Sequence, residues 1–152
     1  MKRVFFVVML LLGLGIFSSC SKDDMAERAL VGTLWESYTI NGKTYNSGSG
    51  ALSRLEFPEK GKVIFTYFGD SIKGEYSVEG NTIYFNLSFA HENDLEQFGQ
   101  IIYHVKEEHQ LKTGTITDSS IEAYMTSVAY LYKTNKIEEM RSDATISFKK
   151  VH

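Results

Sequence analysis

Apolar and polar residues alternate along most of the chain. The alternation is clearest over residues 82–89, where Ile83, Phe85, Leu87 and Phe89 occupy every second position. A period of two is typical of a strand with one buried face. Similar runs recur roughly every ten residues, separated by clusters of Gly, Asn and Asp. They lie at residues 34–40, 54–57, 63–67, 72–78, 101–106, 111–116, 121–132 and 144–151.

This spacing predicts an all-β fold. Strands that follow one another with tight turns indicate an antiparallel up-and-down meander of about 8 to 10 strands, as a barrel or a sandwich. Asn41 and Gly42 form a dipeptide that favours a two-residue hairpin turn.

The pattern also predicts three interruptions of the strands, at residues 90–99, 107–108 and 134–141, and a short helix before the first strand. Residues 90–99 break the alternation, and Asn93 with Glu96 three places on indicates a helical turn. Adjacent Glu107 and Glu108 are expected in a turn. Short helices are expected over residues 23–30 and 134–141.

The first twenty residues are typical of a leader. Lys2 and Arg3 precede an uncharged apolar run at residues 4–17. Fourteen helical residues span about 21 Å, less than the roughly 30 Å of a bilayer core, so a signal peptide is favoured. The residues that follow, with Cys20, resemble a bacterial lipobox, which implies cleavage after residue 19 and lipidation of Cys20. The alternative is an ordinary secretory leader.

Three charged residues follow the cysteine. Lys22, Asp23 and Asp24 resemble the export signal of Bacteroidetes lipoproteins, which implies an outer-membrane protein displayed on the cell surface. The alternative is a solvated tether. Two or more acyl chains hold a protein firmly on a membrane, and a diacylglyceryl cysteine meets that requirement.

The charge balance excludes one class of partner. The chain of 152 residues has a net charge of −3, and removal of residues 1–19 takes away two basic residues and leaves −5. A negative domain lacks the basic footprint of a nucleic-acid-binding protein. The lipid anchor, rather than a basic patch, is expected to hold the protein at the membrane.

The start of the β region carries a further resemblance. Gly32 precedes the single tryptophan, Trp35, at the opening of the first expected strand. This resembles the Gly-x-Trp opening of lipocalins and of lipocalin-like lipoprotein domains of Bacteroidetes, with one extra residue between the two. The resemblance implies a lipocalin-like barrel over residues 29–152, after a lipidated cysteine and short tether at 20–28. The alternative is that Trp35 is a core aromatic of another β fold.

The residues that carry enzyme chemistry are scattered. Four histidines, at positions 91, 104, 109 and 152, lack metal-ligand spacing, and no serine lies in Gly-x-Ser-x-Gly. The single cysteine excludes an internal disulfide. We therefore expect no enzyme, no metal site and no cofactor.

Aromatic residues are the remaining candidates for function. Inward-facing rings of a small barrel either fill it or line a site for one small ligand. We expect a lipid-anchored protein that holds a small, partly apolar ligand in a barrel cavity. The alternative is an interaction module without a cavity, which engages an envelope protein or a glycan through its loops. The candidate lining residues are Phe57, Phe65, Tyr67, Tyr76, Phe85 and Tyr103.

A modification site is also expected. Asp70, Ser71 and Ile72 resemble the acceptor motif of Bacteroidetes O-glycosylation, and the motif falls at an expected hairpin turn. Ser71 is therefore a candidate for O-glycosylation.

The leader predicts acylation of Cys20. We expect the native chain to take up labelled palmitate and to stay with the membrane. Cys20→Ala should lose both properties, because the thiol is the acyl acceptor. Equal label and equal membrane retention in the variant would exclude the assignment.

Overall fold

The computed structural model describes residues 22–44, 53–97, 100–133 and 136–151, and leaves the side chains of 95–97, 100–103 and 133 undescribed. The leader and Cys20 lie outside these residues. One helix and nine strands are present in this part of the chain: α2 (Lys22–Leu30), β1 (Leu34–Ile40), β2 (Lys43–Thr44), β3 (Ser53–Glu59), β4 (Lys62–Tyr67), β5 (Asp70–Glu79), β6 (Thr82–Gln97), β7 (Gln100–Ile116), β8 (Ser120–Lys133) and β9 (Lys136–Lys150).

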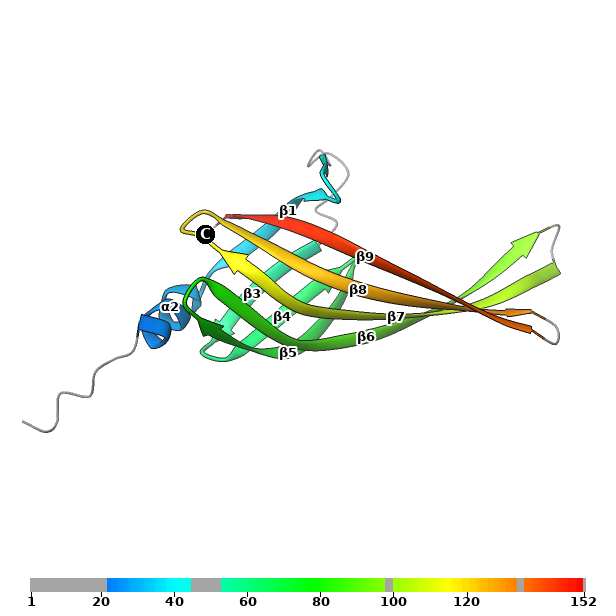
Figure 1. The fold of residues 1–152 in the computed structure, drawn as a ribbon, viewed down its shortest axis with the longest axis horizontal. Coiled ribbons are helices and arrows are strands. Elements are labelled where there is room, and N and C mark those ends of the chain that lie inside the picture. Colours follow the sequence, from blue (N-terminus) through cyan, green and yellow to red (C-terminus); the bar gives the residue numbers. More distant parts are fainter. Residues whose placement is uncertain (1–21, 45–52, 98–99, 134–135, 152) are drawn as a thin grey trace, which may run out of the picture.

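The strands form one closed antiparallel barrel. Strands β3 to β9 pair in chain order, and β1 pairs with both β3 and β9, which closes the sheet into eight strands (Figure 1). The remaining strand, β2, is short and pairs only with β1 among the described strands. Asn41 and Gly42 form its turn with φ angles of 50° and 73°, which Asn and Gly adopt most readily. The predicted all-β meander and the hairpin are confirmed.

Helix α2 covers one end of the barrel (Figure 1). Its last residue, Leu30, is buried. The backbone carbonyl of Glu27 accepts a hydrogen bond from the Tyr76 hydroxyl at 3.2 Å, and the Asp23 carboxylate accepts one from the Gly80 N–H at 2.8 Å. The predicted helix is confirmed, and its acidic first turn suits the positive end of the helix dipole. No helix of the described residues has the length and apolarity to cross a membrane.

Trp35 lies beneath this helix. Its side chain is 2% exposed, and its Nε1 donates to the Thr33 hydroxyl at 2.8 Å. Gly32 makes the bend between α2 and β1 with a φ of 78°, and its N–H donates to the Phe57 carbonyl at 2.8 Å. The Lys150 ammonium lies 5.9 Å from the centre of the Trp35 ring. Helix α2, the bend at Gly32 and the Trp35 ring therefore close this end of the barrel together.

Aromatic rings occupy the barrel interior. Phe57 and Phe65 are fully buried, and Phe57 packs edge-on against Tyr76 at 4.9 Å between ring centres. Phe65 packs against Phe148 at 6.5 Å. Offset and edge-to-face contacts of this kind stabilise a core beyond the burial of apolar area. Four of the six candidate lining residues, Phe57, Phe65, Tyr76 and Phe85, belong to this buried core.

Four strands continue beyond the barrel as an arm. The β5–β6 ladder reaches only Asn86 and the β1–β9 ladder stops at Ile146, whereas β6, β7, β8 and β9 stay paired far beyond these points. Figure 1 shows these strands running past the barrel as two long hairpins. We define the arm as residues 88–97, 100–110, 126–133 and 136–144.

The arm corrects the three predicted interruptions. Residues 90–97 extend β6, Glu107 and Glu108 lie within β7, and residues 136–141 belong to β9 rather than to a helix. In each segment, continuous pairing with a neighbouring strand supplies the backbone hydrogen bonds that a helix or turn would otherwise provide. Tertiary pairing therefore overrides the local preference.

Burial of Trp35 predicts a large loss of stability on its removal. Trp35→Ala should lower the free energy of unfolding by about 3 to 5 kcal/mol, because deletion of a buried aromatic ring leaves a cavity. Tyr124→Ala is a matched control, since that ring is 49% exposed on the barrel wall. Chemical denaturation of both variants measures the difference. A loss below about 1 kcal/mol for Trp35→Ala would contradict its place in the core.

Candidate functional site

The end of the barrel opposite α2 contains an aromatic depression. The helix contacts Lys60 and Gly80, in the β3–β4 and β5–β6 turns, whereas Phe68 lies in the β4–β5 turn at the other end. A depression of about 430 Å³ opens there, between that turn and strands β6 and β7. Small-molecule sites are concave, mainly apolar and carry a few polar groups. The lining residues are Tyr67, Phe68, Asp70, Ile72, Phe89, Ala90, His91, Asn93, Glu107 and His109.

The aromatic rings of this depression continue the packing of the core. Phe65 stacks on Tyr67 at 5.7 Å and lies 6.0 Å from Phe89, and Tyr67 lies 5.6 Å from Phe89. Phe68 then packs edge-on against Tyr67 at 4.6 Å, although its own side chain is 65% exposed. The series therefore passes from a fully buried ring to an exposed one, and leaves apolar ring surface at the barrel end.

His109 forms the polar floor of the depression. It is 7% exposed and stacks on Phe89 at 4.7 Å between ring centres. Its Nδ1 lies 2.7 Å from the Ser127 hydroxyl, and its Nε2 lies 3.3 Å from the Glu107 carboxylate. Burial lowers the pKa of His109, and the nearby Glu107 only partly opposes this effect. The ring is therefore neutral at pH 7.

The partners of His109 assign its tautomer. A carboxylate can only accept, so Nε2–H donates to Glu107, and Nδ1 accepts from the Ser127 hydroxyl. A serine hydroxyl beside a neutral imidazole is the arrangement found in nucleophilic catalysis. Ser127, however, lies within the β7–β8–β9 ladder, where backbone N–H groups bond to neighbouring strands instead of converging on a reacting oxygen. The trio fixes the orientation of His109.

The rim of the depression is acidic. Glu107 is 44% exposed, and Asp70 is 77% exposed with its carboxylate 4.0 Å from Nδ1 of His91. No lysine or arginine is among the lining residues of this depression. Within the described part of the chain, no group of three or more His, Cys, Asp and Glu side chains is placed to hold a metal ion.

The structure does not bring the predicted site residues together in one site. Of the candidate ligand-lining residues, Tyr67 lines the depression, and the side chain of Tyr103 is not described. Asp23 and Asp24 are in the first turn of α2, where Asp24 pairs with Arg28 at 3.2 Å. Ser71 is exposed on β5, beyond a turn made by Phe68 and Gly69 rather than within the turn, and its hydroxyl lies 3.0 Å from that of Thr66.

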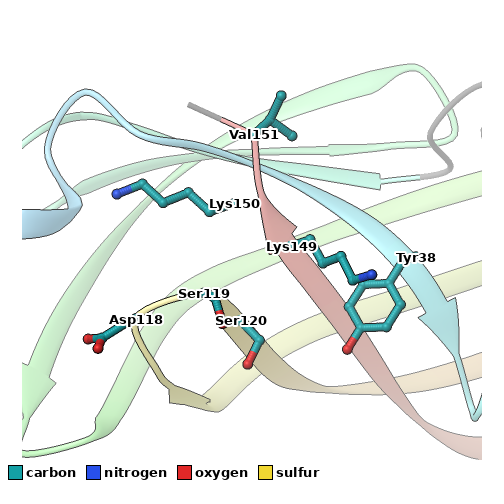
Figure 2. Close-up of a pocket in the computed structure, with 7 residues that line it drawn as sticks. All are labelled: Tyr38, Asp118, Ser119, Ser120, Lys149, Lys150 and Val151. Carbon is teal, nitrogen blue, oxygen red and sulfur yellow. The ribbon is translucent and has the colours of Figure 1, made fainter.

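A broader depression of about 670 Å³ lies on the outside of the barrel near the end of β9 (Figure 2). Figure 2 shows Lys149 extending toward Tyr38 while Lys150 points the opposite way. The Lys149 ammonium lies 4.6 Å from the centre of the Tyr38 ring, so the single aromatic face in this depression is already occupied. The remaining lining is small or charged, and we favour the aromatic depression.

The sequence pattern does not single out His109, which the structure places at the floor of the depression. The turn expected at Glu107 and Glu108 separates His109 from the run that contains Leu111. Without that break, Val105, Glu107, His109 and Leu111 occupy alternate positions on one face of a single strand, and all but Glu107 are buried. The period of two was therefore the available signal.

Comparisons of the chain with protein-family models, curated proteins and solved structures give no match.

The lowered pKa of His109 predicts an acid-sensitive fold. The unfolded chain takes up a proton near the ordinary histidine value of 6.5, whereas the folded chain takes it up only at lower pH. The free energy of unfolding should therefore be highest above that value and fall as the pH decreases from 6.5 toward the folded pKa. His109→Gln should flatten this part of the profile. Chemical denaturation of the native protein and of the His109→Gln variant from pH 8 to pH 5 tests this prediction. If the free energy of unfolding falls equally with pH in both proteins, the lowered pKa of His109 in the folded chain is contradicted.

Proposed function

We propose that this protein is a lipid-anchored binding protein of the bacterial outer membrane, and that it holds a small, partly apolar ligand in the aromatic depression. The observation that carries the proposal is the passage of the ring cluster from buried Phe65 through Tyr67 to exposed Phe68. Exposed rings normally cost solubility, and they are useful where a ligand covers them. The buried interior rings direct the proposal to the barrel end rather than to a central cavity.

The polar groups of the depression suit ligand orientation. His109 is held at both ring nitrogens, so its position is fixed before a ligand arrives. Such preorganisation reduces the entropy cost of binding. Glu107 and Asp70 add acceptors at the rim, which favours a ligand with a hydrogen-bond donor beside its apolar part.

The position of the anchor is compatible with binding. Cys20 is two residues before the start of α2, so an acyl anchor would lie within roughly 7 Å of the helix along an extended chain. That helix covers the end of the barrel opposite the depression. Attachment to a membrane through Cys20 would therefore leave the depression uncovered.

Surface display is part of the proposal, with Lys22, Asp23 and Asp24 as its signal. The two acidic residues also hold the folded domain, because Asp23 accepts from the Gly80 N–H and Asp24 pairs with Lys60. Substitution of the triplet would therefore disturb the barrel end as well as export. Lys22→Ala alone avoids both contacts and is the cleaner variant.

The lipocalin-like assignment also stays a proposal. Its support is the position of Trp35, buried where α2 closes the barrel, beneath a cation from the last strand. The cation is Lys150, where many lipocalins place an arginine.

The binding proposal predicts uptake of an uncharged aromatic probe. N-phenyl-1-naphthylamine should gain fluorescence when it binds the native protein. The aromatic side chains of the depression would shield the rings of the probe from water. Phe68→Asn should weaken the affinity by about tenfold through loss of ring contact. Asparagine tolerates the positive φ of 47° at this position, so the turn is kept.

Tyr84→Ser is the matched control for this experiment. Tyr84 is also an exposed aromatic, at 41%, but it lies outside the depression on the barrel wall. It should leave probe affinity unchanged. Failure of the native protein to bind the probe, or equal affinity of the Phe68→Asn variant, would contradict the site.

A further inference from the structure

Among the described residues, the arm has an unpaired edge on β9. The β1–β9 ladder ends at Ile40 and Ile146, and Asn41 makes the last contacts, with its N–H donating to the Thr145 carbonyl at 2.8 Å and its side-chain oxygen accepting from the Thr145 N–H at 2.9 Å. From there to the tip, residues 136–144 pair with β8 on one side. On the other side, no strand of the described residues pairs with them. This leaves a row of backbone donors and acceptors open to a further strand.

This edge combines exposed apolar side chains with mixed charges. Ile137 is 62% exposed and Met140 is 61% exposed. Glu139 and Arg141 flank Met140 and pair with each other at 2.7 Å. Charges usually protect an edge strand from pairing, because a second strand brings like charges together. Whether they protect this edge depends on the register of the incoming strand.

We propose that two copies of this chain pair antiparallel through residues 136–144 of β9, with a two-fold axis at Met140. An axis that relates two antiparallel strands of one sheet stands perpendicular to the sheet and keeps each side chain on its own face. Opposed side chains share a face, so the axis must pass through a residue pair rather than between residues. The possible registers are therefore few.

An axis at Ile137 would also match charges, with Lys136 opposite Glu138, but it would pair only residues 136–138 of the described edge. Among the registers that pair a longer part of the edge, only one matches the charges. With Met140 on the axis, Glu139 of each copy lies opposite Arg141 of the other, and this occurs twice. An axis at residue 138 or 139 places glutamate against glutamate, and an axis at Arg141 places arginine against arginine. An axis at Ser142 would drive the second strand past Thr145, where Asn41 already occupies the edge. Opposite charges across a strand pair stabilise it and like charges destabilise it.

The Met140 register also builds a charge square. Each Glu139 would contact Arg141 of its own strand and Arg141 of the second copy, so charges alternate around four corners. The other free edge of the arm, residues 88–94 of β6, carries Glu92 and Asp94 but neither lysine nor arginine. It cannot form such a match with itself. Self-pairing is therefore assigned to β9.

Two equally exposed residues provide a sharp test. The full chain is purified in detergent with Cys20→Ala, so that an introduced cysteine is the only thiol. In the proposed register, Met140→Cys faces its own copy across the axis. Ile137→Cys faces position 143, which separates the two thiols by six residues, about 20 Å at 3.3 Å per residue. A short bis-maleimide that spans about 8 Å should link Met140→Cys at least about tenfold faster than Ile137→Cys, because pairing gives a high effective concentration.

Charge reversal provides the second arm of the test. In the Met140→Cys background, Arg141→Glu should slow cross-linking by about tenfold, because two like-charged pairs replace two opposite ones. Adding Glu139→Arg restores the alternation and should restore the rate, whereas Glu122→Arg on the barrel wall should leave it unchanged. Equal rates at positions 137 and 140 would indicate random collision and overturn the proposal. Absence of a linked product, or no rescue by the double charge swap, would overturn it as well.

Discussion

The ladder between β1 and β9 is the constraint on which the molecule depends. Strand β1 is shared: Trp35 lies opposite Leu55 of β3 and also opposite Lys150 of β9. This pairing turns an open meander into a barrel and removes two free edges. It also fixes the interior, because an eight-stranded barrel has room for its own side chains or one small ligand. Here the inward positions carry large rings such as Phe57 and Phe65, so the interior is filled and the aromatic depression lies at one end of the barrel.

Unequal strand lengths decide what those ends become. Strands β1 and β3 have 7 residues and β4 has 6, whereas β6 and β7 have 16 and 17. The barrel can be no longer than its short strands, and the excess length of β6 to β9 continues as the arm. The aromatic depression forms where the short β4–β5 hairpin stops and the long strands go on. At the other end, helix α2 covers Trp35 and Tyr76.

The period of two predicted most of this architecture, because it depends on which side chains face the core. It worked best over residues 82–89, where the strand lies in the barrel wall with one buried face. It also predicted the arm strands at 101–106 and 121–132, and it failed at residues 90–97, 107–108 and 136–141, where charged side chains interrupt the apolar signal. Ile137 and Met140 stand three apart, a helical spacing, yet pairing with β8 makes the segment a strand. The position of His109 is hidden for a different reason, because the charged pair Glu107 and Glu108 within β7 resembles a turn and interrupts a face that is otherwise buried.

The depression and the free edge lie on one row of the sheet. His91 lies opposite Glu107, Glu107 opposite Ala129, and Ala129 opposite Met140, so all four side chains occupy the same face across β6, β7, β8 and β9. The first two line the depression, and the last lies at the open edge. A two-fold axis at Met140 would continue this row into a second copy in reverse order. Because that axis preserves the faces of the sheet, both depressions would open on the same side. The helices that cover the opposite barrel ends would then lie at the two far ends of the pair. The anchors proposed at Cys20 would then lie at the two ends of the pair, and the two proposed sites would open on one face.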